Sequence, residues 1–246
     1  MRSKISKINK FEVGFTLVEL LLALAITGIV ISLTGSGLYA LMNANQRSQN
    51  ETADRLELER AVAFMADEIK MSQQIMTTIP RGSKGENIFN SASGSSSVQV
   101  VLVLKPAANS GLINPIIYYL ADPPNASVWL GPRVIYRWGP TLLQNGNYSN
   151  GDSIDIAKVK PGESVEYFNE VVIDRLSDLV LNQAKINCGS SYNYLDFNTS
   201  SKVKDSSGFY ACVSPDQKSV KLWINKQANL SAKNTMINAL IVTRSN

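Results

Sequence analysis

Near its N-terminus the chain has a long apolar run, which is followed by a region where apolar and polar residues alternate. Between Val13 and Gln46 the only charged residue is Glu19, and the stretch Leu20–Leu41 is long enough to cross a bilayer as a helix. Apolar residues recur at helical spacing from Glu51 to Met76, which predicts an amphipathic continuation of the same helix to about Thr78. The predicted apolar face consists of Leu58, Ala61, Val62, Met65, Ile69 and Met76, and the charged residues Asp54, Glu57, Arg60, Asp67 and Lys70 fall elsewhere on the helical wheel.

After Pro80 and a loop rich in Gly, Ser and Asn, short runs of β-branched and aromatic residues predict strands. These runs are Val98–Leu104, Pro115–Leu120, Val128–Leu130, Arg133–Trp138, Phe209–Val213, Val220–Ile224 and Met236–Val242. Strict alternation in Arg133–Trp138 is typical of an antiparallel strand with one buried face, and the runs at 209 and 220 are spaced as a hairpin. Val165–Gln183 fits a short helix or a strand. The predicted fold class is α+β, with the amphipathic half of a long N-terminal helix packed on an antiparallel sheet.

A basic leader precedes the apolar run. It carries Arg2, Lys4, Lys7 and Lys10 against one acid, Glu12, and positive charge keeps this end in the cytoplasm while the chain beyond Leu41 is exported. A carboxylate inside a membrane helix costs about 2.5 kcal/mol or more on insertion scales, so Glu19 is expected to have a partner. Gly14 directly before Phe15 leaves the backbone accessible to a peptidase at the cytoplasmic face.

The stretch Gly14-Phe15-Thr16-Leu17-Val18-Glu19 resembles the N-terminal motif of type IV prepilins and type II secretion pseudopilins. The resemblance implies cleavage after Gly14 by a prepilin peptidase, N-methylation of Phe15, and pairing of Glu19 with the N-terminal amine of a neighbouring subunit. It also implies a pilin-like fold, and other pilins or pseudopilins and an inner-membrane assembly platform as partners. An uncleaved signal anchor and a secretory signal peptide are the alternatives, but Ala40-Leu41-Met42 fits a secretory cleavage site poorly.

The expected organisation has four parts. Residues 1–14 form the leader, 15–42 the transmembrane or filament-core helix, 43–78 its amphipathic continuation, and 79–246 a β-rich globular domain outside the cytoplasm. The expected location is the bacterial inner membrane as a single-pass protein, and then a pilus or pseudopilus. Gly35-Ser36-Gly37 either loosens the membrane helix or lets neighbouring helices approach closely. The size of the domain and its late hairpins resemble the larger minor pilins and J-class minor pseudopilins.

The chain has no histidine and two cysteines, which excludes a Ser-His-Asp triad and a four-thiolate zinc site. Cys188 and Cys212 are expected to form a disulfide outside the cytoplasm, with two reduced thiols as the alternative for a cytosolic domain. Closing that loop would contribute roughly 3 kcal/mol in the chain-entropy model. No catalytic constellation is visible, so neither enzymatic activity nor a cofactor is expected. The polar stretch holding Asp152, Asp155 and Glu163 matches no EF-hand, and a solvated loop is favoured over a calcium site.

Charge is distributed unevenly along the chain. The formal net charge is +4, but the leader holds four basic residues and one acid, so its removal leaves 20 basic against 19 acidic residues, or +1. The segment from Leu181 to Asn246 holds eight basic and three acidic residues. A solvated surface is the favoured interpretation, and capture of DNA or polysaccharide is the alternative.

The function that the resemblance implies is a minor subunit that initiates or caps a filament, with a tip-located binding subunit as the second hypothesis. The sequence is compatible with a subunit of a type IV pilus, of a type II secretion system or of a DNA-uptake apparatus.

Overall fold

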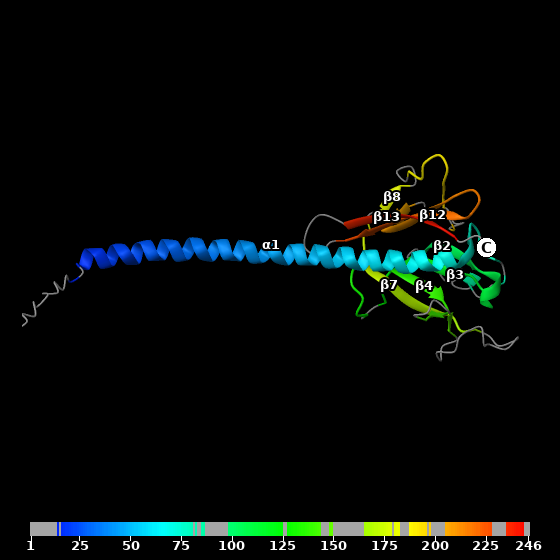
Figure 1. Ribbon diagram of the computed structural model, residues 1–246, viewed down its shortest axis with the longest axis horizontal. Helices are drawn as coiled ribbons and strands as arrows, with labels where there is room; N and C mark the ends of the chain where they lie inside the picture. The colour runs from blue at the N-terminus through cyan, green and yellow to red at the C-terminus, as the bar shows by residue number, and fades with distance from the viewer. Residues whose placement is uncertain are drawn as a thin grey trace, which may run out of the picture. The chain divides into compact units, whose positions relative to one another are not determined.

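The computed structural model describes residues 14, 16–80, 82, 85–86, 98–124, 127–143, 148–149, 165–178, 180–182, 187–195, 197, 205–227 and 235–243. It divides the chain into two compact units, Met1–Gln49 and Asn50–Asn246 (Figure 1). Helix α1 (Leu17–Met71) contributes to both units, and each unit is described by itself below.

The first unit is the N-terminal part of α1, and its large apolar side chains are exposed. The helix is long and apolar enough to cross a membrane, as the sequence predicts. Two threonine hydroxyls of this part bond within the helix: Thr27 Oγ1 donates to the Ala23 carbonyl at 2.7 Å, and Thr34 Oγ1 donates to the Val30 carbonyl at 2.7 Å. Such bonding suits an apolar solvent that offers polar groups no other partner. The Gly35-Ser36-Gly37 stretch is helical in the structure.

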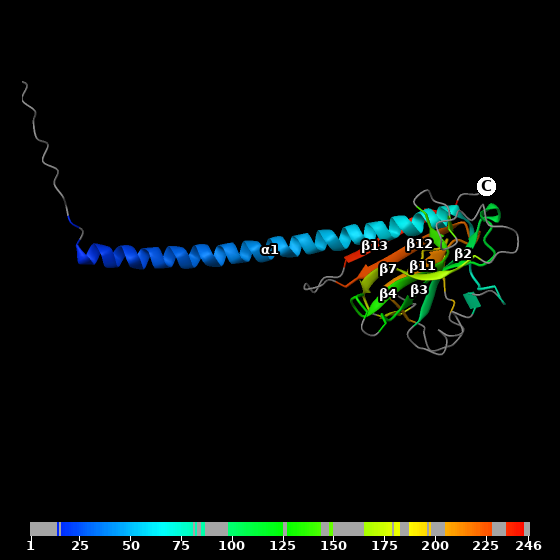
Figure 2. The same cartoon turned by 90° about the horizontal axis from the view of Figure 1, so that it is seen from below.

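The second unit is built from antiparallel strands (Figures 1 and 2). Their bounds are β1 Ser72–Met76, β2 Gln99–Pro106, β3 Ile116–Ala121, β4 Arg133–Gly139, β5 Thr141–Leu142, β6 Tyr148–Ser149, β7 Phe168–Leu176, β8 Val180–Asn182, β9 Asn193–Tyr194, β10 Asp205–Ser207, β11 Phe209–Val213, β12 Ser219–Lys226 and β13 Thr235–Val242, with a short 3-10 helix, η1, at Ala108–Ser110. The main sheet runs β1-β2-β3-β4-β7-β12-β11-β9, and β13 pairs with β12. Strands β8 and β10 form one small sheet, and β5 and β6 form another.

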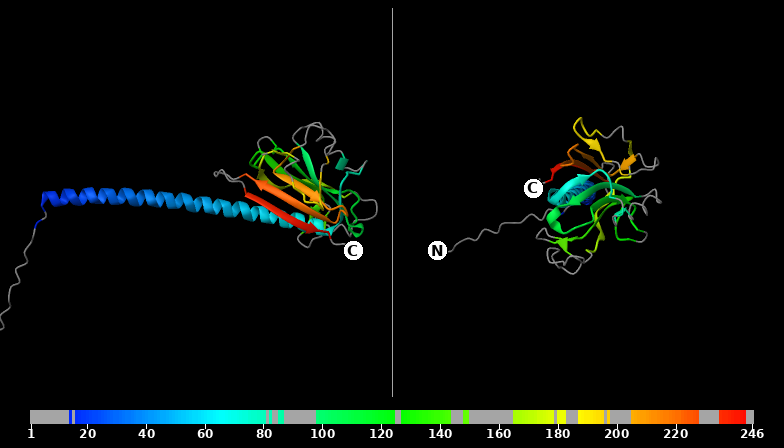
Figure 3. Two further views of the ribbon diagram at one scale, coloured as in Figure 1. Left: turned by 90° about the horizontal axis from the view of Figure 1, so that it is seen from above. Right: turned by 90° about the vertical axis from the view of Figure 1, so that its right-hand side faces the viewer.

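Strands β7 and β12 pair at their last residues, and among the described residues Lys226 and Leu176 are the pair that joins them. Viewed along α1, the strands lie around the part of the helix that belongs to the second unit (Figure 3). Leu58, Met65 and Ile69 of α1 are fully buried and join one continuous core with side chains of β2, β3, β4, β11 and β12. Burial of this apolar surface is the main driving force for packing the helix on the sheet.

The predicted end of the helix was wrong. Helix α1 ends at Met71, and the following residues, predicted to be helical to about Thr78, instead form β1, which pairs with β2. Ser72 Oγ donates to the Ile69 carbonyl at 2.7 Å and thereby satisfies a carbonyl at the end of the helix. Pairing with β2 and the complete burial of Ile75 outweigh the local helical preference.

Most of the predicted strands are present, and the α+β class is confirmed. The predicted hairpin is β11 and β12, which pair from Phe209↔Ile224 to Val213↔Val220. The ambiguous segment 165–183 contains β7 and β8 rather than a helix. Val128–Leu130, predicted as a strand, lies in a loop. Strand β4 does not have one buried and one solvated face, because Arg137 on its predicted polar row is completely buried.

Candidate functional site

The start of α1 carries a capping box formed by two residues of the hexapeptide motif. The Thr16 backbone N–H and the Thr16 hydroxyl each donate to Glu19 Oε2 at 2.9 Å, and the Glu19 N–H donates to Thr16 Oγ1 at 3.3 Å. A Thr at the cap with a Glu three positions later satisfies N–H groups that the first helical turn leaves without partners. The sequence analysis did not detect this role, although the Thr-x-x-Glu spacing is its signature.

The cap changes the interpretation of Glu19. Glu19 has a partner within its own chain, Thr16, and its expected pairing with the N-terminal amine of a neighbouring subunit stays a prediction. Apart from its two chain neighbours, no described residue has an atom within 4 Å of the position that a Cβ of Gly14 would occupy. Phe15 and residues 1–13 lie outside the described residues.

A buried ion pair joins α1 to β4. Arg137 donates to both carboxylate oxygens of Glu68, from Nη2 to Oε1 at 2.6 Å and from Nε to Oε2 at 2.9 Å, and both side chains are fully buried. The Tyr118 hydroxyl also donates to Glu68. Arg137 further contacts Glu170 of β7 at 3.0 Å and donates to the Pro140 carbonyl at 2.7 Å. A bidentate pair with its remaining donors and acceptors used is the arrangement that makes burial of two charges tolerable.

Burial and the charges of the Glu68–Arg137 pair shift the pKa of Arg137 itself and of the neighbouring Tyr118. Burial by itself would lower the pKa of Arg137, but the hydrogen bonds and negative charge of Glu68 outweigh it and raise the pKa. Burial, followed by the charge of Glu68, raises the pKa of Tyr118 well above its ordinary value. Gly139 packs directly on the guanidinium, since a Cβ there would lie 2.9 Å from Arg137 Cζ. The site is therefore a closed structural pair at which no exchangeable ligand is expected.

A second group of charges joins the beginning of the packed part of α1 to the sheet. Arg175 Nη2 lies 3.1 Å from Asp54 Oδ1 and 3.3 Å from Glu57 Oε2. Lys226, which is fully buried, pairs with the same two carboxylates and lies 3.2 Å from Asp54 Oδ1. Arg175 adopts a φ of 55°, an uncommon backbone conformation for a side chain of this size. The surrounding contacts hold it there.

We call these two groups the entry clamp (Asp54, Glu57, Arg175 and Lys226) and the distal clamp (Glu68 and Arg137). The sequence analysis placed Asp54 and Glu57 away from the buried face, but Asp54 is buried and both acids bind sheet cations. Sliding the helix by one residue would rotate it by about 100° and move it by about 1.5 Å. Either change would separate the charges, so the clamps fix the helix in one register on the sheet.

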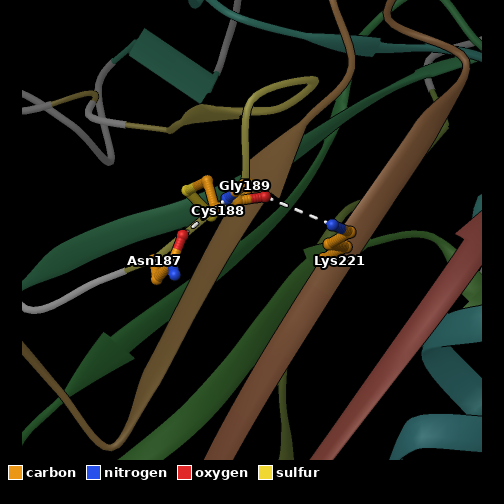
Figure 4. The surroundings of a disulfide bond; sticks show 5 residues. Asn187, Cys188, Gly189 and Lys221 are labelled. Atoms are coloured by element: carbon orange, nitrogen blue, oxygen red, sulfur yellow. Dashed lines mark hydrogen bonds between the residues drawn. A yellow bond between two sulfur atoms is a disulfide. The ribbon is translucent and has the colours of Figure 1, made fainter.

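The two cysteines form a disulfide between Cys188 and Cys212, as predicted, with a Cα–Cα distance of 5.7 Å. It ties the segment before β9 to β11 (Figure 4). Lys221 Nζ donates to the Cys188 carbonyl at 3.2 Å, and the Gly189 N–H donates to Asn187 Oδ1 at 2.9 Å (Figure 4). The disulfide and these hydrogen bonds therefore stabilise the short segment around Cys188 next to β12.

The basic C-terminal third has several of its cations engaged internally. Lys226 belongs to the entry clamp, Lys218 Nζ donates to the Gln73 carbonyl at 2.9 Å, and Lys221 lies 4.1 Å from the Tyr192 ring centroid. A cavity of about 400 Å³ beside β9 and β11 is lined only by uncharged residues. Among the described residues no group of three or more His, Cys, Asp or Glu side chains could hold a metal ion. Of the polar loop considered for calcium, residues 145–163, the structure describes Tyr148 and Ser149, which form β6, whereas Asp152, Asp155 and Glu163 lie outside the described residues.

Comparison with known proteins gives no relative for this chain. No protein-family profile, no curated protein and no solved structure matches it. The fold and the functional interpretation therefore depend on the chain's own residues.

Proposed function

We propose that this chain is a minor type IV pilin or pseudopilin, anchored by α1 in the bacterial inner membrane and processed after Gly14. The observation that carries the proposal is the motif Gly14–Glu19, which stands directly at the start of a continuous 55-residue helix. The exposed first part of this helix suits a membrane or a filament core, and its last part is built into a β-rich domain. That combination is the architecture expected of a pilin-like subunit.

Within such a filament the protein helps to initiate or cap the assembly. A domain of this size is best accommodated at a tip, where it need not pack repeatedly against copies of itself. Prepilin peptidase, other pilins or pseudopilins and the assembly platform are the proposed partners. The binding hypothesis is the weaker one, because the three basic residues of the C-terminal third that the structure describes, Lys218, Lys221 and Lys226, all have intramolecular partners.

Intact-mass analysis of protein extracted from membranes tests the processing step. The expected mature chain begins at N-methylated Phe15, and Gly14→Trp is expected to leave the precursor uncleaved. A mass equal to that of the full-length chain would contradict the proposal.

Glu19 variants test the filament step, and the capping box supplies the matched control. Glu19→Gln retains a side chain that can complete the capping box but removes the charge, whereas Glu19→Ala removes both. If the carboxylate pairs with the Phe15 amine of a neighbour, both variants should lose crosslinking to partner pilins in cells, and Glu19→Asp should be intermediate because its shorter side chain reaches less far. If Glu19→Gln is recruited as well as the parent, the carboxylate acts only as a cap and the assembly role of Glu19 is wrong.

A further inference from the structure

Three consecutive apolar side chains are exposed in the loop between β3 and β4. The exposed fraction is 84% for Val128, 43% for Trp129 and 58% for Leu130. Single exposed apolar residues are ordinary, but a contiguous group that includes a tryptophan marks a surface that contacts something apolar. We call Val128–Leu130 the apolar loop.

The apolar loop is held in place by its backbone. The Leu130 N–H donates to Asp174 Oδ2 at 2.9 Å, and the Leu130 carbonyl accepts from the Arg175 N–H at 2.9 Å. Gly131 has a φ of 88°, and a Cβ there would lie 2.5 Å from Arg175 Cα, so this close approach requires glycine. The loop is therefore fixed to the end of β7 with its side chains exposed.

The loop lies at the end of the second unit where the chain enters it from the N-terminal side. Arg175, to which the loop is bonded, belongs to the entry clamp and contacts Asp54, which follows the first residue of the unit by four positions. The acids nearby have basic partners: Asp54 and Asp174 contact Arg175, and Asp122 lies 3.4 Å from Arg133. No charged residue occurs from Ser127 to Pro132.

We propose that the apolar loop is a membrane-interface contact that seats the domain on the bilayer crossed by α1. The inference rests on the proposed membrane anchoring. Tryptophan favours the headgroup level of a bilayer, where its ring is buried and its N–H stays hydrated. Because the loop is uncharged, it suits a zwitterionic lipid surface and does not require anionic lipid.

The distance along the chain sets a condition on this contact. Met42 and Asp54 are separated by twelve positions, or about 18 Å of helix. A tilt of the membrane helix from the bilayer normal, which is common for membrane helices, is therefore required for the loop to reach the lipid surface.

The test uses the full chain in nanodiscs of phosphatidylcholine, loaded at one chain per disc. The emission of Trp129 is obtained as the difference between the parent and Trp129→Phe, which leaves the other two tryptophans in place. With lipids brominated close to the headgroup, we expect Trp129 to lose most of its emission and to be shielded from acrylamide in water. Val128→Ser/Leu130→Ser should reduce both effects without unfolding the domain, since both side chains are already exposed.

The matched control places a tryptophan at the other end of the domain. Ile113 is 95% exposed and lies in the β2–β3 connection, at the end of the sheet where Pro106 pairs with Ser72 just after α1 ends. Trp129→Phe/Ile113→Trp keeps the number of tryptophans, and its new tryptophan should be quenched by acrylamide but not by brominated lipid.

Four results would overturn the proposal, each for a different reason. Equal lipid quenching at positions 129 and 113 would show that the loop does not select the membrane. Shielding of Trp129 that appears only with several chains per disc, without lipid quenching, would show that the loop contacts another chain. A chain that does not enter the discs would refute the membrane anchoring itself, and the loop contact with it, whereas a chain that enters without quenching refutes the loop contact alone.

Discussion

The distal clamp gives the sharpest prediction about stability. Glu68→Gln leaves the buried Arg137 with a neutral partner, although Glu170 and the Pro140 carbonyl remain in contact with it. Breaking a buried pair typically costs 3–5 kcal/mol, so with these remaining contacts we expect a loss of about 3 kcal/mol in the free energy of unfolding. Arg137→Met leaves the buried Glu68 carboxylate with neutral tyrosine hydroxyls, Tyr118 and Tyr148, as hydrogen-bond donors and without the guanidinium, and the expected loss is about 5 kcal/mol.

The double variant separates the pair from its surroundings. If the two charges stabilise each other, Glu68→Gln/Arg137→Met should be more stable than the sum of the single losses predicts, by about 2 kcal/mol or more. Urea unfolding of the full chain in detergent, followed by tryptophan fluorescence, gives the four stabilities. The exposed pair Arg55–Glu59, at 2.9 Å, is the control, and its coupling should stay below about 0.5 kcal/mol. Additive losses at Glu68 and Arg137 would refute the reasoning, whatever their individual size.

Three further predictions concern the same domain. Gly139→Ala should destabilise it by about 1–3 kcal/mol because the new Cβ overlaps the Arg137 guanidinium, and the effect should largely disappear in an Arg137→Met background, as urea unfolding would show. Cys212→Ser should lower the free energy of unfolding by about 2–5 kcal/mol, and non-reducing peptide mapping should find the Cys188–Cys212 crosslink, whereas two free thiols per chain would contradict it. Burial, followed by the neighbouring Tyr136, raises the pKa of Tyr119 to about 12, so the folded state retains a proton that the unfolded state loses near pH 10. The free energy of unfolding should therefore fall as the pH rises from about 10 to 12. A spectrophotometric tyrosine titration in which every phenol of the folded protein ionises near pH 10 would contradict this.

The sequence predicted the elements better than it predicted their pairing. Runs of β-branched and aromatic residues located β2, β3, β4, β11, β12 and β13, because such side chains suit a half-buried sheet, but the short strands β5, β6, β9 and β10 between β4 and β11 were not predicted. The helix end was misplaced since Met76 continues the helical spacing, and only the pairing of β1 with β2 shows that this segment is extended. Val128–Leu130 resembles a strand in composition but is bonded to β7 as a loop.

The charged clamps could not be predicted from one sequence. Arg137 occupies an ordinary polar position in an alternating strand, and its partner Glu68 lies 69 positions earlier on a different element. Hydropathy assigns both residues to the surface, because burial of either charge becomes acceptable only when the other is opposite. The capping box was within reach of the sequence, since Thr16 and Glu19 are three positions apart.

The two clamps also have a mechanical consequence. They hold α1 near both ends of its packed segment, so a pull along the helix axis acts on the entry clamp and the distal clamp together. The helix can slide only if the ion pairs of both clamps break at the same time. In the same step the buried apolar side chains between the clamps must lose their packing against the sheet. Tension applied to the N-terminal part of α1 is therefore passed to the sheet through several contacts at once, and the domain should stay attached to its helix under a force that would peel away a helix held at one point.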